Sequence, residues 1–273
     1  MGREELAVEF DAFERAGWRG RSEAYEQGVA LLTARLIEPL LDEARVGAGG
    51  RVLDVGCGPG GVSAAALARG AEVTAADAEP EMVAATVRRL PGVRVEHAIL
   101  PVLPFEDGEF DAAVGNLIIN HVGDPRAAVR ELRRVVRPGG RVALTSWYYP
   151  KMRATVVFDE AVAAVGVPRP ADVPEKSPFQ AYGTPESFAG LLQDAGYTEV
   201  RARTLEWEHT VDPEEWWTAI LTGTARTAAV IARQNPATIE RVKAAYHAIL
   251  APHLTEDGRA TLPAAALLTS ATR

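Results

Sequence analysis

Cysteine and long hydrophobic runs are what this sequence of 273 residues has least of. Its single cysteine, Cys57, excludes an intramolecular disulfide and therefore the class of small secreted domains that depend on disulfides. The longest apolar stretches, such as 262–268, are too short to cross a bilayer, so we expect no membrane partner. The sequence also opens without a basic segment followed by an apolar one, and we therefore expect a cytoplasmic protein.

An excess of positive charge and the spacing of metal ligands are missing as well. Lysine and arginine number 29 against 37 acidic residues, which gives a formal net charge of -8. Binding to phosphates normally needs a basic surface, so this balance argues against a nucleic-acid partner. The histidines are scattered without metal-ligand spacing, so we expect no metal. They are His97, His121, His209, His247 and His253.

The clearest positive signal is the segment 52–61, Val-Leu-Asp-Val-Gly-Cys-Gly-Pro-Gly-Gly. An apolar strand runs into a glycine turn and then into an alanine-rich helix, an order that brings backbone N–H groups close to a ligand. Gly56, Gly58 and Gly61 also match the G-x-G-x-x-G pattern of dinucleotide-binding folds. The motif predicts a nucleotide-like cofactor without saying which one.

Strand and helix patterns alternate from residue 50 onward, which predicts a parallel α/β sheet covered on both faces. Ligands of such sheets bind at the carboxyl ends of the strands. The expected strands are 51–55, 72–76, 93–97, 110–115 and 141–147, and the expected helices are 60–69, 79–89 and 124–136.

Helical segments are expected on either side of this alternating region. We predict an N-terminal helical cap over 1–45, a cofactor-binding core over 46–150, and a C-terminal half of the core over 151–273. The cap holds a helix over 3–16 and one over 22–44, which starts at Ser22 and bends or ends near Pro39. The C-terminal half begins with an excursion over 148–183 that contains a helix at 154–165, followed by a helix to Ala195 and a strand at 197–210. A helical lid insertion over 212–255 comes next, in two pieces broken near Asn235-Pro236, and a last strand lies at about 260–270.

Two acidic residues flank the expected cofactor site. Asp77 ends the second strand, where its carboxylate can accept hydrogen bonds from both ribose hydroxyls of an adenosine. It can also cap the following helix, and both roles are compatible. Asp54 is unusual in a buried strand: it suits a ligand with a nearby ammonium group, or it makes a purely structural bond to the loop.

Several motifs at family spacing resemble the class I S-adenosylmethionine-dependent methyltransferases, and above all the small-molecule type that includes ubiquinone and menaquinone biosynthesis methylases. The resemblance is strong over about residues 45–150. It implies a Rossmann-like sheet of seven strands, mostly parallel with an antiparallel last strand, and S-adenosyl-L-methionine as the cofactor. The motifs are 52–61, Asp77, 103–111, 116–125 and 132–140.

The resemblance also implies a role for individual residues at the cofactor. Gly56, Cys57 and Gly58 would face the methionine moiety, and Asp77 would hold the ribose. Around the adenine, Ala78 and Met82 would pack on one side and Ile99 and Leu100 would lie at the edge, while Asn116 would offer its backbone carbonyl to the cofactor amino group. Tyr25 either closes over the cofactor carboxylate or is an ordinary tyrosine of an amphipathic helix.

One position departs from the family pattern. Members of this subgroup commonly have an aspartate where this chain has Ile99, and that aspartate accepts a hydrogen bond from the adenine amino group. A lost polar contact of this kind costs about 0.5–1.5 kcal/mol. The departure leaves room for a chain that uses the fold for a reaction other than methyl transfer.

Catalytic and substrate contacts are expected after the fourth and fifth strands. His121 is the candidate general base, because histidine titrates nearest neutral pH, and the alternative is a packing or capping role. Asn120 lies beside it, and we expect at least one of Trp147, Tyr148 and Tyr149 to contact substrate. His209 and Trp216 either wall the substrate cavity or pack against the insertion.

These observations predict a methyltransferase that acts on a small organic metabolite by in-line displacement at an oxygen, nitrogen or carbon acceptor. Three alternatives remain open. They are a cyclase, decarboxylase or isomerase on the same fold, a binding protein that senses the cofactor, and a nicotinamide oxidoreductase. Asp54 and the Leu-Pro-Phe and Arg-Pro-Gly-Gly turns argue against the last. The sequence indicates no oligomeric state.

Overall fold

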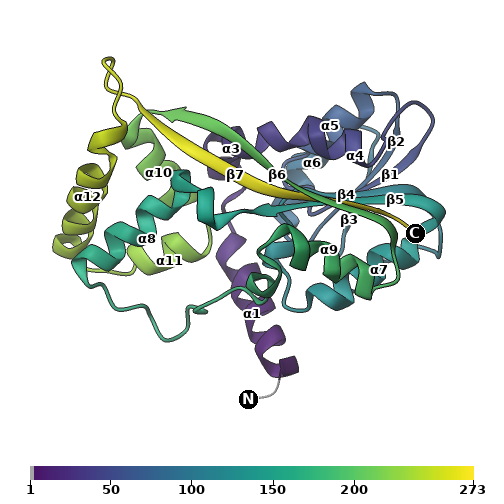
Figure 1. Cartoon of the computed structure of the whole chain (residues 1–273), viewed down its shortest axis with the longest axis horizontal. Coiled ribbons are helices and arrows are strands. Elements are labelled where there is room, and N and C mark those ends of the chain that lie inside the picture. The colour runs from purple at the N-terminus through teal and green to yellow at the C-terminus, as the bar shows by residue number, and fades with distance from the viewer. Residues whose placement is uncertain (1–2) are drawn as a thin grey trace.

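The structure, a computed structural model, describes residues 3–273 and contains one sheet of seven strands. The strands are β1 (Arg51–Val55), β2 (Glu72–Asp77), β3 (Arg94–His97), β4 (Phe110–Gly115), β5 (Val136–Trp147), β6 (Thr198–Val211) and β7 (Ala260–Thr272). Their order is β3-β2-β1-β4-β5-β7-β6, and β7 runs antiparallel to both of its neighbours (Figure 1). The predicted mostly parallel sheet with an antiparallel last strand is confirmed.

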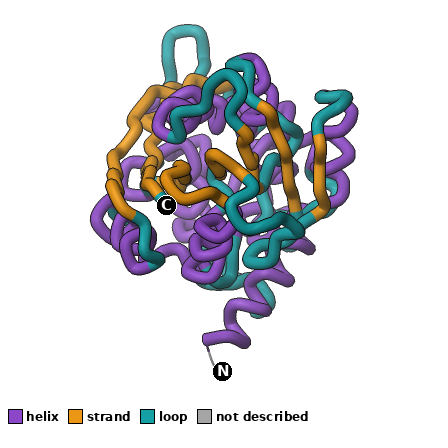
Figure 2. Tube along the Cα trace, turned by 90° about the vertical axis from the view of Figure 1, so that its right-hand side faces the viewer, coloured by secondary structure: helices purple, strands orange, loops and turns teal. Residues whose placement is uncertain are grey.

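Twelve α-helices surround this sheet in the described part of the chain (Figure 2). The N-terminal ones are α1 (Arg3–Trp18), α2 (Ser22–Gln27), α3 (Val29–Thr33) and α4 (Ile37–Glu43). The others are α5 (Gly61–Ala68), α6 (Pro80–Arg89), α7 (Pro125–Val135), α8 (Arg153–Val165), α9 (Pro185–Asp194), α10 (Pro213–Gly223), α11 (Arg226–Ile231) and α12 (Pro236–Leu250). None of these helices combines the length and the apolar character that a bilayer span requires.

Neighbouring strand residues bury their side chains on opposite faces of the sheet. Leu53 belongs to a core shared with α7 and α9, whereas Val52 belongs to a core shared with α4 and α5. The same switch separates Val142 from Ala143. A strand that is buried on both faces of a sheet needs apolar residues at successive positions. This is why the strand segments of the sequence are continuous apolar runs rather than alternating apolar and polar residues.

The two C-terminal strands reach beyond the rest of the sheet. β7 pairs with β5 only over 266–272, while its pairing with β6 continues back to Ala260 (Figure 1). The protruding half of this strand pair carries a second core, which α8, α10 and α12 build together around Phe158, Trp217 and Tyr246. The excursion and the insertion, far apart in sequence, therefore share one helical unit.

Two predicted helices are divided differently from the expectation. The segment 22–44 breaks at Gly28 and again in a 3-10 turn, Ala34–Leu36, while Pro39 lies inside α4. Pro39 fits there because the first turn of a helix has N–H groups without intrahelical partners, so a missing one costs little. The prediction of a break near Pro39 was wrong.

The lid insertion consists of three helices rather than the two that we predicted. The break near Asn235-Pro236 is confirmed, and the Asn235 side chain caps α12. An additional break follows α10 at Thr224, whose backbone is extended. There the Arg21 guanidinium donates to the carbonyl oxygens of Leu221 and Thr222, at 3.2 and 2.6 Å. This contact from the turn between α1 and α2 satisfies carbonyl groups at the end of α10, and no local pattern signals it.

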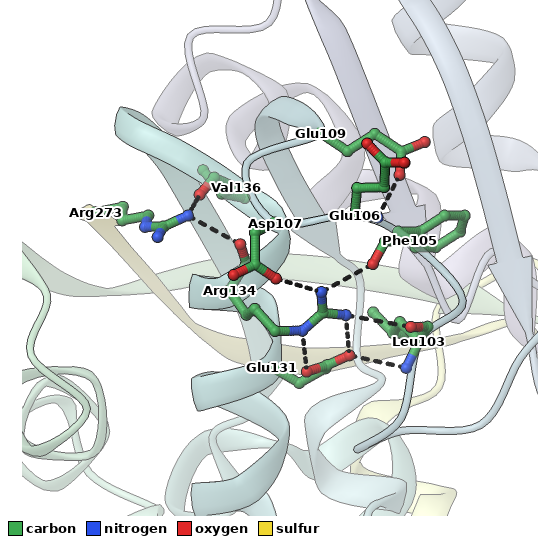
Figure 3. A network of polar contacts seen from close by, with 9 residues as sticks. All are labelled: Leu103, Phe105, Glu106, Asp107, Glu109, Glu131, Arg134, Val136 and Arg273. Atoms are coloured by element: carbon green, nitrogen blue, oxygen red, sulfur yellow. Dashed lines mark hydrogen bonds and ion pairs between the residues drawn. The ribbon is translucent and has the colours of Figure 1, made fainter.

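The loop between β3 and β4 is held by one side chain of α7, Arg134 (Figure 3). Its guanidinium donates to the carbonyl oxygens of Leu103 and Phe105, at 3.2 and 2.8 Å, and to the carboxylates of Asp107 and Glu131, at 2.7 Å each. Glu131 in turn accepts from the Leu103 N–H at 2.9 Å. The Leu-Pro-Phe-Glu-Asp-Gly motif thus has a structural role, because it fixes the loop that follows Ile99.

Candidate active site

A cavity of about 610 Å³ lies between the carboxyl ends of the parallel strands and the helices of the cap and the lid. Its volume falls within the range of about 300–1,000 Å³ that is usual for small-molecule sites. The predicted cofactor residues that line it are Tyr25, Gly56, Cys57, Gly58, Asp77, Ala78, Met82, Ile99, Leu100 and Asn116. The structure therefore brings together residues from five separate sequence motifs.

The glycine loop leaves β1 through backbone conformations that favour glycine. Gly56, Gly58 and Gly60 have φ angles of 68°, 54° and 85°. A Cβ atom on Gly56 would come within 2.6 Å of the Ile118 side chain. The loop is thus shaped so that its backbone, rather than side chains, faces the cavity, as a cofactor that binds through backbone amides requires.

Asp77 anchors this loop from the end of β2. One carboxylate oxygen accepts from the N–H of Gly58 and the other from the N–H of Glu79, both at 2.9 Å. Burial raises the pKa of Asp77, while these hydrogen bonds lower it. The carboxylate lines the cavity, so it lies where a ribose could be held. Through the Glu79 N–H it fixes the turn between β2 and α6, but it makes no cap on α6 itself, so the predicted capping role is not found.

Asp54 lies behind the loop and does not line the cavity. It is fully buried, and one of its oxygens accepts a hydrogen bond of 2.6 Å from the Ser63 hydroxyl. Its second oxygen has no hydrogen-bond partner among the described residues. Burial raises the pKa of Asp54 to about 7, against the lowering effect of Ser63. The observed contact of Asp54 is thus a bond to the helix that follows the loop.

Tyr25 and Asn116 close the cavity from two further elements. Tyr25 lies over Gly58, where a Cβ would come within 3.9 Å of its ring, and its hydroxyl lies 3.2 Å from the Thr33 hydroxyl. The Asn116 side chain donates to the Thr33 carbonyl at 3.3 Å and accepts from Thr145 at 2.7 Å. The Asn116 side chain is therefore occupied by the protein, which is compatible with a role for its backbone alone.

His121 faces the same cavity from the turn that follows β4. Its Nδ1 lies 2.7 Å from a carboxylate oxygen of Glu14, which comes from α1 and also accepts from the Trp18 indole N–H at 3.1 Å. Glu14 is only 6% exposed. A carboxylate on Nδ1 fixes the imidazole in the tautomer that leaves Nε2 as an acceptor. The geometry of a general base oriented by an acid is therefore present.

The residues predicted to contact substrate divide into two groups. Asn120, Trp147 and Tyr149 line the cavity. Tyr148 instead packs against the core that α7 and α9 share with the sheet, at the point where β5 has ended and a 3-10 turn, Tyr149–Lys151, begins.

The other two predicted substrate residues, His209 and Trp216, lie outside the cavity lining and pack edge to face with their ring centroids 5.0 Å apart. Burial, together with Arg35 and Arg259, lowers the pKa of His209 to about 4. Its ring therefore stays neutral, which fits a packing role.

The polar and aromatic residues of the cavity that were not predicted from the sequence include four that bear on its chemistry. They are Glu14, Trp18, Asp159 and Arg226. Glu14 and Trp18 are four residues apart on α1, a spacing that places two side chains on one helix face. That spacing is a sequence signal for a shared face of α1 at Glu14 and Trp18.

The cavity offers neither a reactive thiol nor a cluster of metal ligands among the described residues. Burial raises the pKa of the Cys57 thiol far above its usual range, so the thiolate is disfavoured. Among residues 3–273, no three histidine, cysteine, aspartate or glutamate side chains lie close enough together to hold a metal ion.

Several known proteins with similar sequences are named as methyltransferases. Residues 53–144 match the family model described as "Methyltransferase domain". The demethylmenaquinone methyltransferase of Clavibacter sepedonicus is 34% identical over 185 residues, which cover 63% of this chain and 73% of that protein. The ubiquinone biosynthesis O-methyltransferase of Xanthomonas oryzae pv. oryzae is 41% identical over 106 residues, 36% of this chain and 44% of that protein.

Solved structures share the fold at lower identity. The YcgJ protein of Bacillus subtilis superposes with a TM-score of 0.55 at 21% identity, covering 88% of this chain and 98% of that one. The [4+2]-cyclase SpnF superposes with a TM-score of 0.50 at 22% identity, covering 88% and 80%. Together with the glycine loop, Asp77 and the strand order, the sequence matches show that the chain belongs to the family of S-adenosylmethionine-dependent methyltransferases.

Proposed function

We propose that this methyltransferase acts on a small organic metabolite that must lose a proton, and that His121 is the base that takes it. The observation that carries this proposal is the 2.7 Å contact between Glu14 and His121 in the wall of the cofactor cavity. A similar sequence named demethylmenaquinone methyltransferase supports an acceptor of small-molecule size. The cavity volume supports it as well.

The residues of the cavity fit the cofactor of the family. The backbone of the loop at Gly56 and Gly58 would face the methionine moiety, Asp77 would hold the ribose, and Ala78 and Met82 would form an apolar wall for the adenine. When bound, S-adenosylmethionine supplies a methyl group that its sulfonium has already activated for in-line displacement. The chain's own work is therefore to orient the acceptor, exclude water and receive a proton.

Each part of the fold has a place in this proposal. Residues 46–150 hold the cofactor, while the cap over 1–45 and the lid over 212–255 close the cavity and select the acceptor. Trp18 packs edge to face with His121, with ring centroids 5.3 Å apart, and Trp147 lines the same cavity; such indole rings suit an aromatic or quinone-like body. Asn120 lies next to the base, where it would contact the acceptor.

The test is incubation of the protein with S-adenosylmethionine and a panel of phenols, quinols and amines. We expect one class of acceptor to gain the mass of one methyl group in place of hydrogen. His121→Gln should lower kcat about 100-fold or more while the affinity for S-adenosylhomocysteine stays unchanged. The matched control is His247→Gln, since His247 forms a similar pair with Glu214 at 2.9 Å on the surface of the lid.

A second candidate is a non-methylating enzyme on the same fold. It is favoured by Ile99, which is 37% exposed, lines the cavity and replaces the acid common in this subgroup. Such an enzyme would convert its substrate without a gain in mass, and S-adenosylhomocysteine would not inhibit it. That outcome would replace the methyl-transfer proposal.

A further inference from the structure

Three polar side chains that follow β5 along the chain line the same cavity. Tyr149 follows β5, Asp159 lies on α8 and Arg226 begins α11, and all three line the cavity. The charges of Arg226, Asp159 and Glu14 all act on the Tyr149 hydroxyl. This cluster, Tyr149–Asp159–Arg226, is therefore within electrostatic reach of the Glu14–His121 pair, yet methyl transfer itself does not need it.

The cluster faces the cavity rather than the outer surface of the protein. Tyr149 keeps 38% of its surface exposed, and Asp159 is exposed as well. Even so, desolvation by the surrounding protein raises the pKa of both side chains. A group can be accessible and desolvated together only when it points into a confined space, which is where a substrate would lie.

Arg226 carries a charge that the protein does not pair directly. No described carboxylate lies within 4 Å of its guanidinium; its nearby partner is the Tyr149 hydroxyl, and Asp159 acts on it from farther away. A surface arginine of the same lid, Arg233, shows the usual arrangement, with Asp172 at 2.5 Å. The guanidinium of Arg226 therefore has donors free to bind a ligand.

We propose that Arg226 and Tyr149 bind a carboxylate group on the methyl acceptor, and that this contact orients the opposite end of the acceptor toward His121. The inference rests on the proposed function, since it names a feature of that substrate. A guanidinium and a phenol hydroxyl both donate to an anion, and Arg–carboxylate pairs are among the strongest charge-assisted hydrogen bonds. An ammonium ligand would instead need Asp159 to be charged, which its desolvated position disfavours.

The experiment compares two probes of the same shape, 4-hydroxybenzoate and 4-hydroxybenzamide. Calorimetry measures the binding of each to the protein saturated with S-adenosylhomocysteine. We expect the carboxylate to bind about tenfold more tightly or better, because one hydrogen bond to a charged group is worth that much. Equal affinity, or no carboxylate binding by protein that still binds S-adenosylhomocysteine, overturns the inference.

Variants assign the preference to the cluster. Arg226→Gln should abolish the discrimination between the two probes, and Arg226→Lys should keep part of it. Asp159→Asn should leave the carboxylate affinity unchanged, because desolvation already disfavours the charged form of Asp159. If Asp159→Asn weakens the binding of the probes and Arg226→Gln does not, the site binds through Asp159 rather than Arg226, and the inference is wrong.

Two controls separate this inference from the rest of the protein. Arg233→Gln removes a lid arginine that does not line the cavity, and both affinities should stay as in the wild type. S-adenosylhomocysteine binding by each variant reports that it is folded. All these measurements are equilibrium affinities and need no turnover. If the carboxylate preference is missing, this inference fails, but methyl transfer to other acceptors is not contradicted. If no acceptor in the panel is methylated, the proposed function fails, which is a separate result.

Discussion

Glu14 and His121 lie 107 residues apart in the sequence and 2.7 Å apart in the structure. Their contact joins α1 to the turn after β4, and a second bond supports it, from the Gly123 N–H to the Asp11 carboxylate at 2.6 Å. A Cβ on Gly123 would collide with the Ala7 carbonyl oxygen at 2.2 Å, so the helix rests directly on the backbone there. The N-terminal cap thus brings a carboxylate to the reacting end of the cavity.

The first prediction concerns Glu14→Gln. The amide keeps the size of the side chain but loses the charge that favours the correct tautomer and stabilises a protonated imidazole. We expect kcat to fall about tenfold with little change in KM. The pH–rate profile should differ from that of the wild type, because the side chain beside Nδ1 no longer carries a charge. Steady-state kinetics between pH 5 and 9 measure both effects.

The pH profile distinguishes positioning from folding. A variant that was merely destabilised would lose activity at every pH in proportion. An unchanged profile with unchanged kcat would remove Glu14 from the mechanism. The double variant with His121→Gln should be no slower than His121→Gln alone, since two residues that act as a unit are not additive.

The second prediction concerns Asp77→Asn. The amide can still accept one hydrogen bond, but it cannot accept from both ribose hydroxyls as a carboxylate does. We expect the affinity for S-adenosylmethionine and for S-adenosylhomocysteine to fall about 10- to 100-fold, the value of hydrogen bonds to a charged group. Calorimetry checks it, with NAD as the comparison ligand. Tight binding of NAD by the wild type would contradict the cofactor assignment.

The fold was largely predictable because its information is local. Each core strand is a short apolar run bounded by glycine, proline or a charged residue, and the segment 110–115 is an example that the structure reproduces without change. The sheet order then follows from the family resemblance. By contrast, the break at Thr224 depends on Arg21, about 200 residues away, and such a contact leaves no trace in the local pattern.

The cavity was predictable on its cofactor side and after β4 and β5, but not where α1, α8 and α11 line it. Gly56 and Asp77 occupy fixed places in a motif, so spacing alone positions them. Asp159 and Arg226 lie on helices whose sequences show ordinary amphipathic patterns, and their meeting is decided by how the lid packs on the protruding strands. Tyr148 packs in the core while Trp147 and Tyr149 line the cavity, because β5 ends at Trp147 and the chain turns there, which the sequence pattern did not show.

The third prediction uses the buried carboxyl of Asp54. Its pKa is about 7 in the folded protein, against about 3.9 in an unfolded chain, so the folded state binds more protons between these values. Stability without cofactor should therefore fall as the pH rises from about 4 to 7, by an amount on the order of 4 kcal/mol from this group. Asp54→Asn should flatten that part of the profile.

Urea denaturation at several pH values measures the Asp54 effect. Ser63→Ala provides the comparison, because the Ser63 hydroxyl lowers the pKa of Asp54 and its loss should extend the decline to higher pH. Identical slopes for the wild type and Asp54→Asn would show that Asp54 is not the group that takes up the proton.

The fourth prediction concerns Arg134, the centre of the network in Figure 3. Arg134→Gln removes the bonds to the carbonyl oxygens of Leu103 and Phe105. Because its side chain is one-third exposed, we expect a loss of only about 1–2 kcal/mol of stability. The loop that carries Ile99 and Leu100 should become more mobile. The affinity of the folded variant for S-adenosylmethionine should therefore fall, in addition to the loss of folding stability. Hydrogen exchange of 99–107 tests this, with no change expected around α12.

The last prediction concerns the glycine loop and uses a pair of matched substitutions. Gly56→Ala introduces a side chain at a φ of 68°, and its Cβ would lie 2.6 Å from Ile118 in the cavity wall. Gly20→Ala introduces the same side chain at a φ of 75° with nothing within 4 Å. Both variants should lose about 1–2 kcal/mol through left-handed backbone strain. Only Gly56→Ala should also lose S-adenosylhomocysteine affinity in calorimetry, since Ile118 and the loop must separate. Wild-type affinity in Gly56→Ala would mean that the close approach of the loop to Ile118 is not what shapes the cofactor site.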